Sequence, residues 1–476
     1  MKKLFSVLLL CVIIVMGMFG FAGCGDPFND DELGRDEVEN KVTIRFGYLA
    51  EEKDLAVVIK REFEKQNDTI NLKMEPISGD WKSAMNQYVA KPSNFPDIVW
   101  VPSDQHSSYS KGGAFVDLRP LMEADEATAP SLYYDSMIET THYSATDEGI
   151  WYAPRDYNKP VTYINKKMFA AAGVEIPAQK DWNYEKFLEV CAKLRKAMDE
   201  NGRGSENFDA EKFAVGIEPN SFPVESEMWW NPVYHSAIES FGGSLIDTDL
   251  SGRDAITVDS DKTVAAYRKI YSEMFVNDYS FGPQDGTAST AFLSSKAAMW
   301  FSVRPKLPTI LKRDIDVDFL PLPFDKIGAG NSGYAITYVA KDRLSDKGGN
   351  TKNNEQLAWE VIKWLITEPG QQVLGRSGAG IPVLKSMKDS GDWITENDPT
   401  LNHQAFTAYE ERDIGLNVFN IYDPDNHKVM FDTMTLVMTK AISDNSWEKK
   451  GDTYEMSAGF VNDLKAYKEA MLAKAE

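Results

Sequence analysis

Residues 42–77, VTIRFGYLAEEKDLAVVIKREFEKQNDTINLKMEPI, carry the clearest structural signal in the chain. Apolar and polar residues alternate over 42–48, which predicts a β-strand, and apolar residues follow at helical spacing over 55–63. A second strand is predicted at 70–74, and a third, short and mostly apolar, at 97–101. Strand, helix and strand in this order predict a parallel sheet covered by helices.

The alternation of strands and helices continues along the chain. We expect a strand at 161–164, a helix that ends at Gly173, and further helices at 183–198, 262–274 and 357–367. The 476 residues are too many for one ordinary hydrophobic core, so two domains or lobes are expected.

The first 24 residues have the profile of a secretory signal. Two lysines precede an apolar run over 4–22, which ends in Ala-Gly before Cys24. This looks like a bacterial lipobox, in which residues 1–23 are removed and lipid on Cys24 holds the protein at the outer face of the cell membrane. A retained membrane anchor is the alternative, because an apolar run of about 18 residues or more can span a bilayer. Residues 24–40, rich in Pro, Gly, Asp, Glu and Asn, predict a flexible acidic stalk.

Charge and cysteine content exclude some classes of protein. The net charge of −22, or −24 once the two lysines of the signal are removed, argues against nucleic-acid binding. Cys11 lies in the signal and Cys24 in the lipobox, so the mature chain cannot form an intramolecular disulfide. The remaining cysteine, Cys191, lies in a helical apolar stripe and is predicted to be a buried core residue rather than a nucleophile.

Several motifs that suggest a cofactor or metal have a simpler interpretation. Residues 328–333, GAGNSG, match Gly-x-Gly-x-x-Gly, but they precede a strand-like run at 334–339, which favours a glycine-rich crossing between lobes. Residues 247–258 begin like a calcium loop, yet Val258 stands where a bidentate glutamate is needed, so a hairpin turn is favoured. The five histidines have no partners at ligand spacing, and neither a metal nor a cofactor is predicted.

Nearly all of the expected mature chain carries short motifs in a particular order. They are FPDIV (95–99), GGAFVDLRPL (112–121), GIWYAP (149–154), VTYINKKMFAAAGV (161–174), FGGSL (241–245), KAAM (296–299), PLP (321–323), GYAI (333–336) and AWEVIKWL (358–365). In this order they resemble the family 1 extracellular solute-binding proteins, the receptors of sugar-importing ABC transporters that include the maltodextrin-binding proteins.

The resemblance implies an α/β fold of two lobes, periplasmic-binding-protein-like and of type II, with parallel-rich sheets flanked by helices and a hinged cleft between the lobes. It implies that lobe one holds 41–155 and 334–384, and that lobe two holds 156–333 and 385–476. Ligands of open parallel sheets bind outside the carboxyl ends of the strands, which agrees with a cleft between facing lobes. The implied function is a monomeric, lipid-anchored receptor that captures a mono- or oligosaccharide and delivers it to an ABC transporter permease.

A sugar site needs flat aromatic side chains for stacking and polar side chains for paired hydrogen bonds. Trp229 and Trp230 are adjacent, and we expect at least one of them to line the cleft; the alternative is a core tryptophan. Asp104 follows the strand at 97–101, where the family has a lobe-one carboxylate, although a loop-capping role fits nearly as well.

The remaining ligand-binding candidates lie at the expected lobe crossings or on the cleft rim: Arg155, Asp156, Tyr157, Tyr334 and Trp81. Arg155 and Asp156 could instead pair with each other in solvent.

Arg304 bears on the type of ligand. It stands close to where the family usually carries an aromatic residue, so it could contact a carboxylate or phosphate of an acidic ligand. The alternative functions are a surface glycoside hydrolase with two catalytic carboxylates, a non-sugar receptor of the same fold, and a lipoprotein scaffold. The 73 acidic residues would allow many carboxylate pairs, so acidity alone does not support a hydrolase, and no catalytic residue is predicted.

Overall fold

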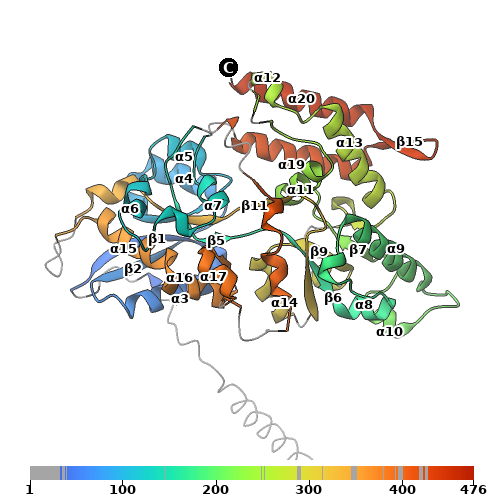
Figure 1. Cartoon of the computed structure of the whole chain (residues 1–476), viewed down its shortest axis with the longest axis horizontal. Helices are drawn as coiled ribbons and strands as arrows, with labels where there is room; N and C mark the ends of the chain where they lie inside the picture. The colour runs from blue at the N-terminus through green and yellow to red at the C-terminus, as the bar shows by residue number, and fades with distance from the viewer. Residues whose placement is uncertain are drawn as a thin grey trace, which may run out of the picture.

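The computed structural model of the chain has two lobes joined by crossing strands (Figure 1). It describes residues 33–34, 38, 40–144, 146–247, 249–250, 252–286, 291–313, 315–344, 351–378, 380–391, 393–394, 400–416, 422–423 and 427–475. The predicted signal at 1–23, Cys24 and nearly all of the stalk at 24–40 lie outside these residues.

Lobe one is built on a sheet with the strand order β2-β1-β3-β12-β4. The strands are β2 (Ile70–Ile77), β1 (Val42–Leu49), β3 (Ile98–Pro102), β12 (Ser332–Ile336) and β4 (Ala153–Pro154). β1 pairs in parallel with both β2 and β3, and α3 (Lys53–Glu64) connects β1 to β2. The prediction of strand, helix and strand from residues 42–77 is therefore confirmed. The other helices of this lobe include α4 (Trp81–Ala90), α5 (Ser107–Lys111), α7 (Asp135–Glu139), α15 (Asn354–Ile366) and α16 (Glu368–Ser377), and α17 (Lys385–Ser390) lies near α16.

Lobe two is built on a second sheet, β10-β6-β9-β7-β8. The strands are β10 (Val317–Pro321), β6 (Val161–Asn165), β9 (Ala297–Ser302), β7 (Phe222–Glu225) and β8 (Ser280–Phe281). Its helices include α8 (Lys166–Ala172), α9 (Tyr184–Glu200), α11 (Asn231–Ser240), α13 (Asp261–Ile270), α14 (Leu307–Lys312), α19 (His427–Ser443) and α20 (Ala458–Ala475).

Local sequence signals set the ends of several lobe-two helices. Gly173 ends α8 with φ of 68°, a left-handed conformation that suits glycine, as predicted. The Asn183 side chain accepts a hydrogen bond from the Lys186 amide and so caps the start of α9. The helix predicted at 262–274 is α13 continued by a π-helical turn over Tyr271–Phe275.

The sheets are mixed, which corrects the expectation of parallel-rich sheets. β12 runs antiparallel to β3 and β4, and β6 runs antiparallel to β9 and β10. β12 runs antiparallel to β3 because it follows a crossing of the chain between the lobes. Ser332, where β12 begins, pairs with Pro102, where β3 ends, because β12 enters sheet one from the edge at which β3 leaves it.

The glycine-rich stretch at 328–333 forms part of a lobe crossing, as predicted, rather than the start of a helix. It comprises the end of β11 (Ile327–Ala329) and the start of β12. A Cβ atom on Gly333 would stand 2.2 Å from the carbonyl oxygen of Ala153 in the neighbouring β4, so the two backbones can come this close only with glycine.

Replacing Gly333 by alanine is expected to lower the free energy of unfolding by about 1 to 3 kcal/mol, because the added methyl group overlaps backbone that cannot move aside. Urea denaturation of the two proteins measures the difference. Gly459→Ala in α20 is the matched control, since its Cβ would meet only the Ser457 hydroxyl oxygen, at 3.7 Å. A Gly333→Ala protein as stable as the control would contradict this account of the crossing.

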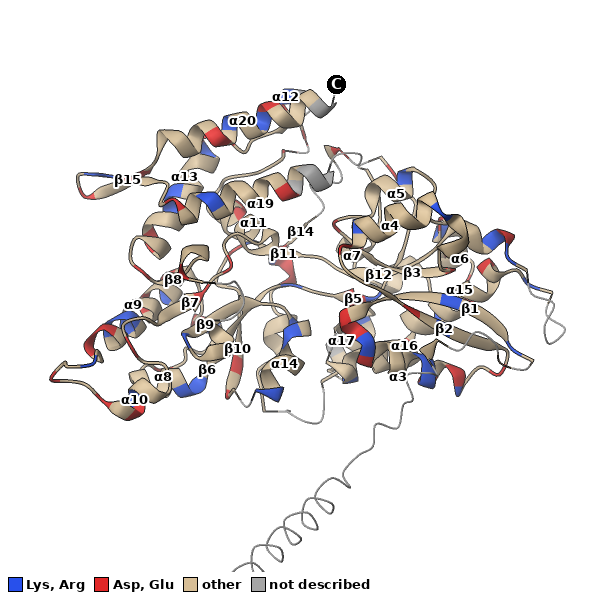
Figure 2. Cartoon of the chain, turned by 180° about the vertical axis from the view of Figure 1, so that it is seen from behind, with Lys and Arg blue, Asp and Glu red and all other residues tan. Residues whose placement is uncertain are grey.

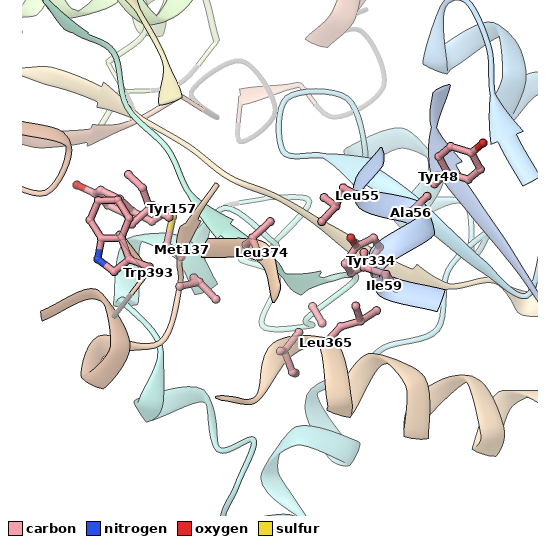
Figure 3. Close-up of a cluster of buried hydrophobic side chains, with 14 of the residues drawn as sticks. Tyr48, Leu55, Ala56, Ile59, Met137, Tyr157, Tyr334, Leu365, Leu374 and Trp393 are labelled. Atoms are coloured by element: carbon pink, nitrogen blue, oxygen red, sulfur yellow. The ribbon is translucent and has the colours of Figure 1, made fainter. Parts of the chain in front are cut away.

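A hydrophobic cluster extends from one lobe into the other. It includes Phe46 in β1 of lobe one and Trp300 in β9 of lobe two, and Figure 3 shows the part from Tyr48 to Trp393. A Cβ atom on Gly375 of α16 would stand 2.5 Å from Cβ of Trp393, so the segment after α17 packs against lobe one. The hydrophobic core is continuous between the lobes here, so it does not mark where one lobe ends and the other begins. The expected boundaries at 155/156, 333/334 and 384/385 remain predictions.

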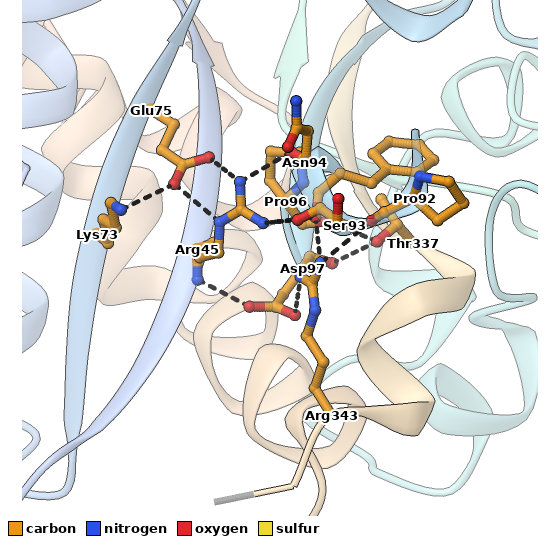
Figure 4. Close-up of polar contacts among 11 residues, drawn as sticks. Arg45, Lys73, Glu75, Pro92, Ser93, Asn94, Pro96, Asp97, Thr337 and Arg343 are labelled. Carbon is orange, nitrogen blue, oxygen red and sulfur yellow. Dashed lines mark hydrogen bonds and ion pairs between the residues drawn. The ribbon is translucent and has the colours of Figure 1, made fainter. Parts of the chain in front are cut away.

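Polar contacts fasten β1, β2 and the turn before β3 to one another (Figure 4). The guanidinium of Arg45 donates to both carboxylate oxygens of Glu75, at 2.8 and 2.7 Å. Asp97, at 0 % exposure, accepts from the Arg45 amide at 2.9 Å and from Arg343 at 2.8 Å. The bond between Arg343 and Asp97 spans 246 residues of sequence and fixes the segment after β12 beside the turn before β3.

Three features of the structure bear on expectations from composition: the distribution of charge, the burial of Cys191 and the apolar character of the helices. Charged residues are spread over the outer helices of both lobes in the view of Figure 2. Cys191 is fully buried in the lobe-two core, as predicted, and burial raises the pKa of its thiol well above the ordinary value. Within the described part of the chain, no helix has both the length and the apolar character needed to cross a membrane.

Candidate functional site

Connections between the lobes meet along one seam. β5 (Asp156–Tyr157) follows β4 and pairs antiparallel with β13 (Ile381–Pro382), which lies between α16 and α17. Between β10 and β12, β11 pairs in parallel with β14 (Asp413–Gly415). We define the interlobe seam as residues 328–331 together with the three segments that meet them, namely the turn after β3, the residues after β5 and the residues around the start of α11.

Lobe one and the first connection both reach this segment. The amide of Ser103, just after β3, donates to the Asn331 carbonyl at 3.3 Å. Asn158, just after β5, exchanges two backbone hydrogen bonds with Gly330, at 3.0 and 2.9 Å. The turn that carries Asp104 is therefore held against the crossing.

Lobe two reaches the same segment at Gly328. A Cβ atom on Gly328 would stand 3.0 Å from the carbonyl oxygen of Pro232 in the first turn of α11. Because α11 begins directly after Trp230, the start of α11 and the turn after β3 meet the same four-residue segment. The carboxyl ends of β3 and β7 thus face the seam, where ligands of such sheets bind.

Three amide side chains on segments that adjoin the seam have an oxygen without a hydrogen-bond partner in the protein. They belong to Gln105 in the turn after β3, Asn158 in the first connection, and Asn231 at the start of α11. Each oxygen is buried, and an unpaired buried acceptor costs free energy. A ligand that donates hydrogen bonds, as a hydroxyl does, would satisfy such atoms.

Trp229 and Trp230 lie in the turn between β7 and α11, and both are half-buried. Trp229 packs against the cluster that extends between the lobes and against the lobe-two cluster, whereas Trp230 packs against the lobe-two cluster and stands at the N-cap position of α11. Neither indole is enclosed in a core, so each keeps an accessible part. Their role as a stacking platform stays a prediction.

Asp104 lies half-buried between β3 and α5, next to Gln105. Its position beside the seam suits a carboxylate that accepts hydrogen bonds from a ligand. That role also stays a prediction.

Arg155 and Asp156 use their polar atoms within the protein. The guanidinium of Arg155 donates to both oxygens of Glu52, at 2.6 and 3.0 Å, and to Asp156 at 2.7 Å. Asp156 also accepts from the amide and hydroxyl of Ser332, at 2.7 and 2.9 Å. The pair lies buried at the crossing rather than in solvent, and its contact with a ligand remains a prediction.

Tyr157 and Tyr334 are buried at the same crossing. Tyr157 donates a hydrogen bond to Asp413, and burial together with that carboxylate raises its pKa well above the ordinary value. The guanidinium carbon of Arg155 lies 5.7 Å from the ring centre of Tyr334. Burial raises the pKa of Tyr334 to about 12. Both hydroxyls are therefore neutral near pH 7.

Trp81 lies in the core of lobe one, which corrects the expectation of a cleft-rim residue. It opens α4, is 5 % exposed, and donates its indole N–H to the Trp100 carbonyl at 2.8 Å. Its ring packs edge-on against Tyr109. The Asp80 side chain caps α4 and so starts the helix in a position that turns the indole inward.

Arg304 is enclosed by the protein, which argues against the expected contact with an acidic ligand. Its guanidinium lies 4.4 Å from the ring centre of Trp393 and 5.6 Å from that of Phe406, and Nη1 is 3.0 Å from Nδ1 of His403. The residue is 0 % exposed, and burial lowers its pKa to about 10. Segments 89 and more residues further along the chain cover it, which the local sequence could not indicate.

The described residues contain no group of three or more His, Cys, Asp or Glu side chains placed to hold a metal ion. Ile246 and Ile256 form an antiparallel bridge, consistent with the turn predicted for the calcium-like motif. Two surface hollows of about 460 Å³ each lie on lobe one, lined by residues such as Leu132 and Arg376, and neither includes a predicted ligand-binding residue.

Sequence reasoning missed Gln105, Asn158 and Asn231. Gln105 and Asn231 each adjoin a residue that was selected, Asp104 and Trp230, and Asn158 follows the selected Arg155-Asp156-Tyr157. Proximity to those motifs was the available signal. What distinguishes them is an unpaired buried oxygen, which depends on tertiary structure.

Two α/β lobes that meet at a polar and aromatic seam define the class of hinged solute-binding proteins. The model of the family described as bacterial extracellular solute-binding protein matches residues 47–372, so the chain belongs to that family of extracellular binding proteins. A comparison with curated protein sequences gave no match.

Solved structures with the same fold include three with bound ligands. The ABC substrate-binding protein Lmo0181 from Listeria monocytogenes, in complex with cycloalternan, has a TM-score of 0.69 at 16 % identity over 91 % of this chain and 99 % of that one. MalE from Bdellovibrio bacteriovorus, bound to maltotriose, has a TM-score of 0.65 at 13 % identity over 91 % and 100 %. UgpB from Mycobacterium tuberculosis, in complex with glycerophosphocholine, has 0.66 at 13 % identity over 92 % and 100 %. These similarities establish the two-lobe fold.

Proposed function

We propose that this protein is a lipid-anchored receptor that captures a neutral carbohydrate at the interlobe seam and delivers it to an ABC transporter permease, without catalysis. The observation that carries the proposal is that a half-buried tryptophan pair and three unpaired amide oxygens lie on segments that adjoin residues 328–331. Sugars present apolar C–H faces and rows of hydroxyls, and these two kinds of group match them.

Relatives in fold carry oligosaccharides in two cases and glycerophosphocholine in another, so fold alone leaves the ligand open. The aromatic pair Trp229 and Trp230 favours a sugar. The enclosure of Arg304 by Trp393 supports a neutral ligand rather than a uronate or phosphate.

Replacing Trp229 and Trp230 singly by alanine is expected to weaken binding of maltotriose or maltotetraose by about 1 to 3 kcal/mol in at least one case, because a stacking surface is lost. Melting of the ligand-free protein should change little, since neither indole is fully buried. Calorimetry with each sugar and a thermal melt of the free protein measure the two effects.

Trp364→Ala provides the control for this test. Trp364 is also partly buried but packs against Phe63 on the outside of lobe one, so sugar affinity should not change. A loss of about 3 to 5 kcal/mol in stability from both Trp229→Ala and Trp230→Ala, with unchanged affinity, would identify core tryptophans and contradict the proposal.

The lipid anchor is tested by Cys24→Ala in the full-length chain. The variant should lose acylation and leave the membrane fraction, while ligand affinity stays unchanged, because the predicted stalk separates the lipid from the folded lobes. Fractionation with metabolic labelling by a radioactive fatty acid provides the measurement. A variant that stays in the membrane with residues 1–23 uncut would show a retained anchor instead.

A further inference from the structure

Glu227 has an unusual combination of backbone and side-chain environment. Its φ is 48°, a left-handed conformation that residues with a side chain rarely adopt, and the residue is only 9 % exposed. The other described non-glycine residues with positive φ are exposed or half-buried: Asn40, Asp278, Ser295, Tyr409 and Asn445. Glu227 therefore combines backbone strain with burial of an acidic side chain.

The strained residue begins the turn that carries the tryptophan pair. β7 ends at Glu225, and the Trp230 amide then donates to the Glu227 carbonyl at 2.8 Å, which closes the turn before α11. The conformation of Glu227 thus sets the direction in which Met228, Trp229 and Trp230 leave the sheet.

The side chain of Glu227 ties this turn to the neighbouring strand. Its Oε1 accepts a hydrogen bond from the indole Nε1 of Trp300 at 2.6 Å. Trp300 is itself held in the core, 1 % exposed on β9 and stacked on Phe292 with ring centres 5.7 Å apart. A short bond between a carboxylate and a rigid buried donor is a strong anchor.

We propose that Glu227 is a positioning residue: its bond to Trp300 holds the strained turn in the conformation that presents Trp229 and Trp230 to a sugar. This inference rests on the proposed function of the tryptophan pair. Strain that persists because surrounding bonds hold it is common where a binding surface must be preorganised.

Replacing Glu227 by glycine separates the effect of its hydrogen bond to Trp300 from the effect of its strained backbone. In Glu227→Gly the positive φ becomes favourable while the bond to Trp300 disappears, whereas Glu227→Gln keeps an oxygen acceptor for Trp300. Trp300→Phe removes the donor from the other side. Asn445→Gly is the matched control, because Asn445 has the same φ of 48° but is exposed in the turn between α19 and β15 (Trp447–Lys450), far along the chain from the seam.

The test has two readouts, of which the first does not depend on the ligand. The first is acrylamide quenching of tryptophan fluorescence in the ligand-free protein. Each variant is compared with the same variant that also carries Trp229→Phe and Trp230→Phe, and the difference in quenching gives the contribution of the pair. The second is maltotriose affinity by calorimetry, together with the melting temperature.

For Glu227→Gly and Trp300→Phe we expect greater quenching of the tryptophan pair and a loss of affinity of about tenfold or more. Glu227→Gly should melt near or below the wild-type temperature, because relief of the strained φ is offset by the buried Trp300 N–H that loses its acceptor. Glu227→Gln should stay within about threefold of the wild-type affinity, and Asn445→Gly should change neither affinity nor quenching.

Unchanged quenching in Glu227→Gly would overturn the proposal, because the pair would then keep its place without the anchor. A loss in Glu227→Gln as large as in Glu227→Gly would also overturn it, since the carboxylate would then act directly on the ligand. If wild-type protein does not bind maltotriose, the proposed function fails for that sugar, while the quenching experiment still decides whether Glu227 positions the pair.

Discussion

Arg155→Met is expected to lower the free energy of unfolding by about 3 to 5 kcal/mol, because it leaves two carboxylates without their cation. Arg155 is 4 % exposed and pairs with Glu52 and Asp156. Burial lowers the pKa of Arg155, but the charges of Glu52, Tyr334 and Asp156 outweigh it and raise that pKa well above the ordinary value. Urea denaturation at neutral pH provides the measurement.

Two comparisons show whether the buried charge is the cause. Arg155→Met combined with Asp156→Asn should recover part of the loss, because the stranded carboxylate becomes neutral. Arg61→Met, which removes a largely exposed ion pair with Glu62, should cost at most about 1 kcal/mol. Equal stability of wild type and Arg155→Met would refute the account of this crossing.

Asp413→Asn is expected to be as damaging, with a loss of about 3 to 5 kcal/mol at pH 7, because it leaves the Lys159 ammonium buried without a counter-charge. The Lys159 Nζ lies 2.7 Å from Asp413 and also donates to the Ala408 carbonyl at 2.7 Å. Asparagine has the same shape and can still accept from Tyr157, so the substitution removes little besides charge.

The loss should depend on pH in a defined direction. Burial, only partly opposed by Asp413, already lowers the pKa of Lys159 below its ordinary 10.5, and removal of Asp413 lowers it further. Between the folded pKa and 10.5 the unfolded chain binds more protons, so stability rises with pH. Deprotonation of Lys159 should therefore reduce the deficit of Asp413→Asn between pH 7 and about 9.5, below the range in which unfolded tyrosines ionise.

Denaturation curves of wild type and Asp413→Asn at both pH values measure this effect. Asp463→Asn is the control, because its ion pair with Lys440 is exposed and should be worth at most about 1 kcal/mol at either pH. A deficit of Asp413→Asn that stays constant over this range would show that the charge of Lys159 is not its cause.

Much of the secondary structure could be predicted because its signals are local. The alternation at 42–48, the helical spacing at 55–63 and the glycine at 173 correspond to β1, α3 and the end of α8. Each signal depends on neighbours within one or two turns. The direction of β12 was not predictable in this way, because it depends on which edge of a distant sheet the chain enters.

The candidate site was only partly predictable for the same reason. Trp229, Trp230 and Asp104 were selected from residue type and position, and the structure places them in turns next to the seam. Trp81 and Arg304 have equally suitable side chains, yet one is turned inward by its helix and the other is covered by Trp393 and Phe406.

The sequence by itself determined which segments form strands and helices, where several helices end, and where glycines let the chain cross between lobes. Periodicity, capping and steric freedom act over a few residues, so they can be read locally. Only the tertiary structure decided which polar atoms at the seam remain unpaired and which charges are already neutralised. Burial and partners come from segments far apart in the chain: Arg155 meets Glu52 across 103 residues, and Lys159 meets Asp413 across 254.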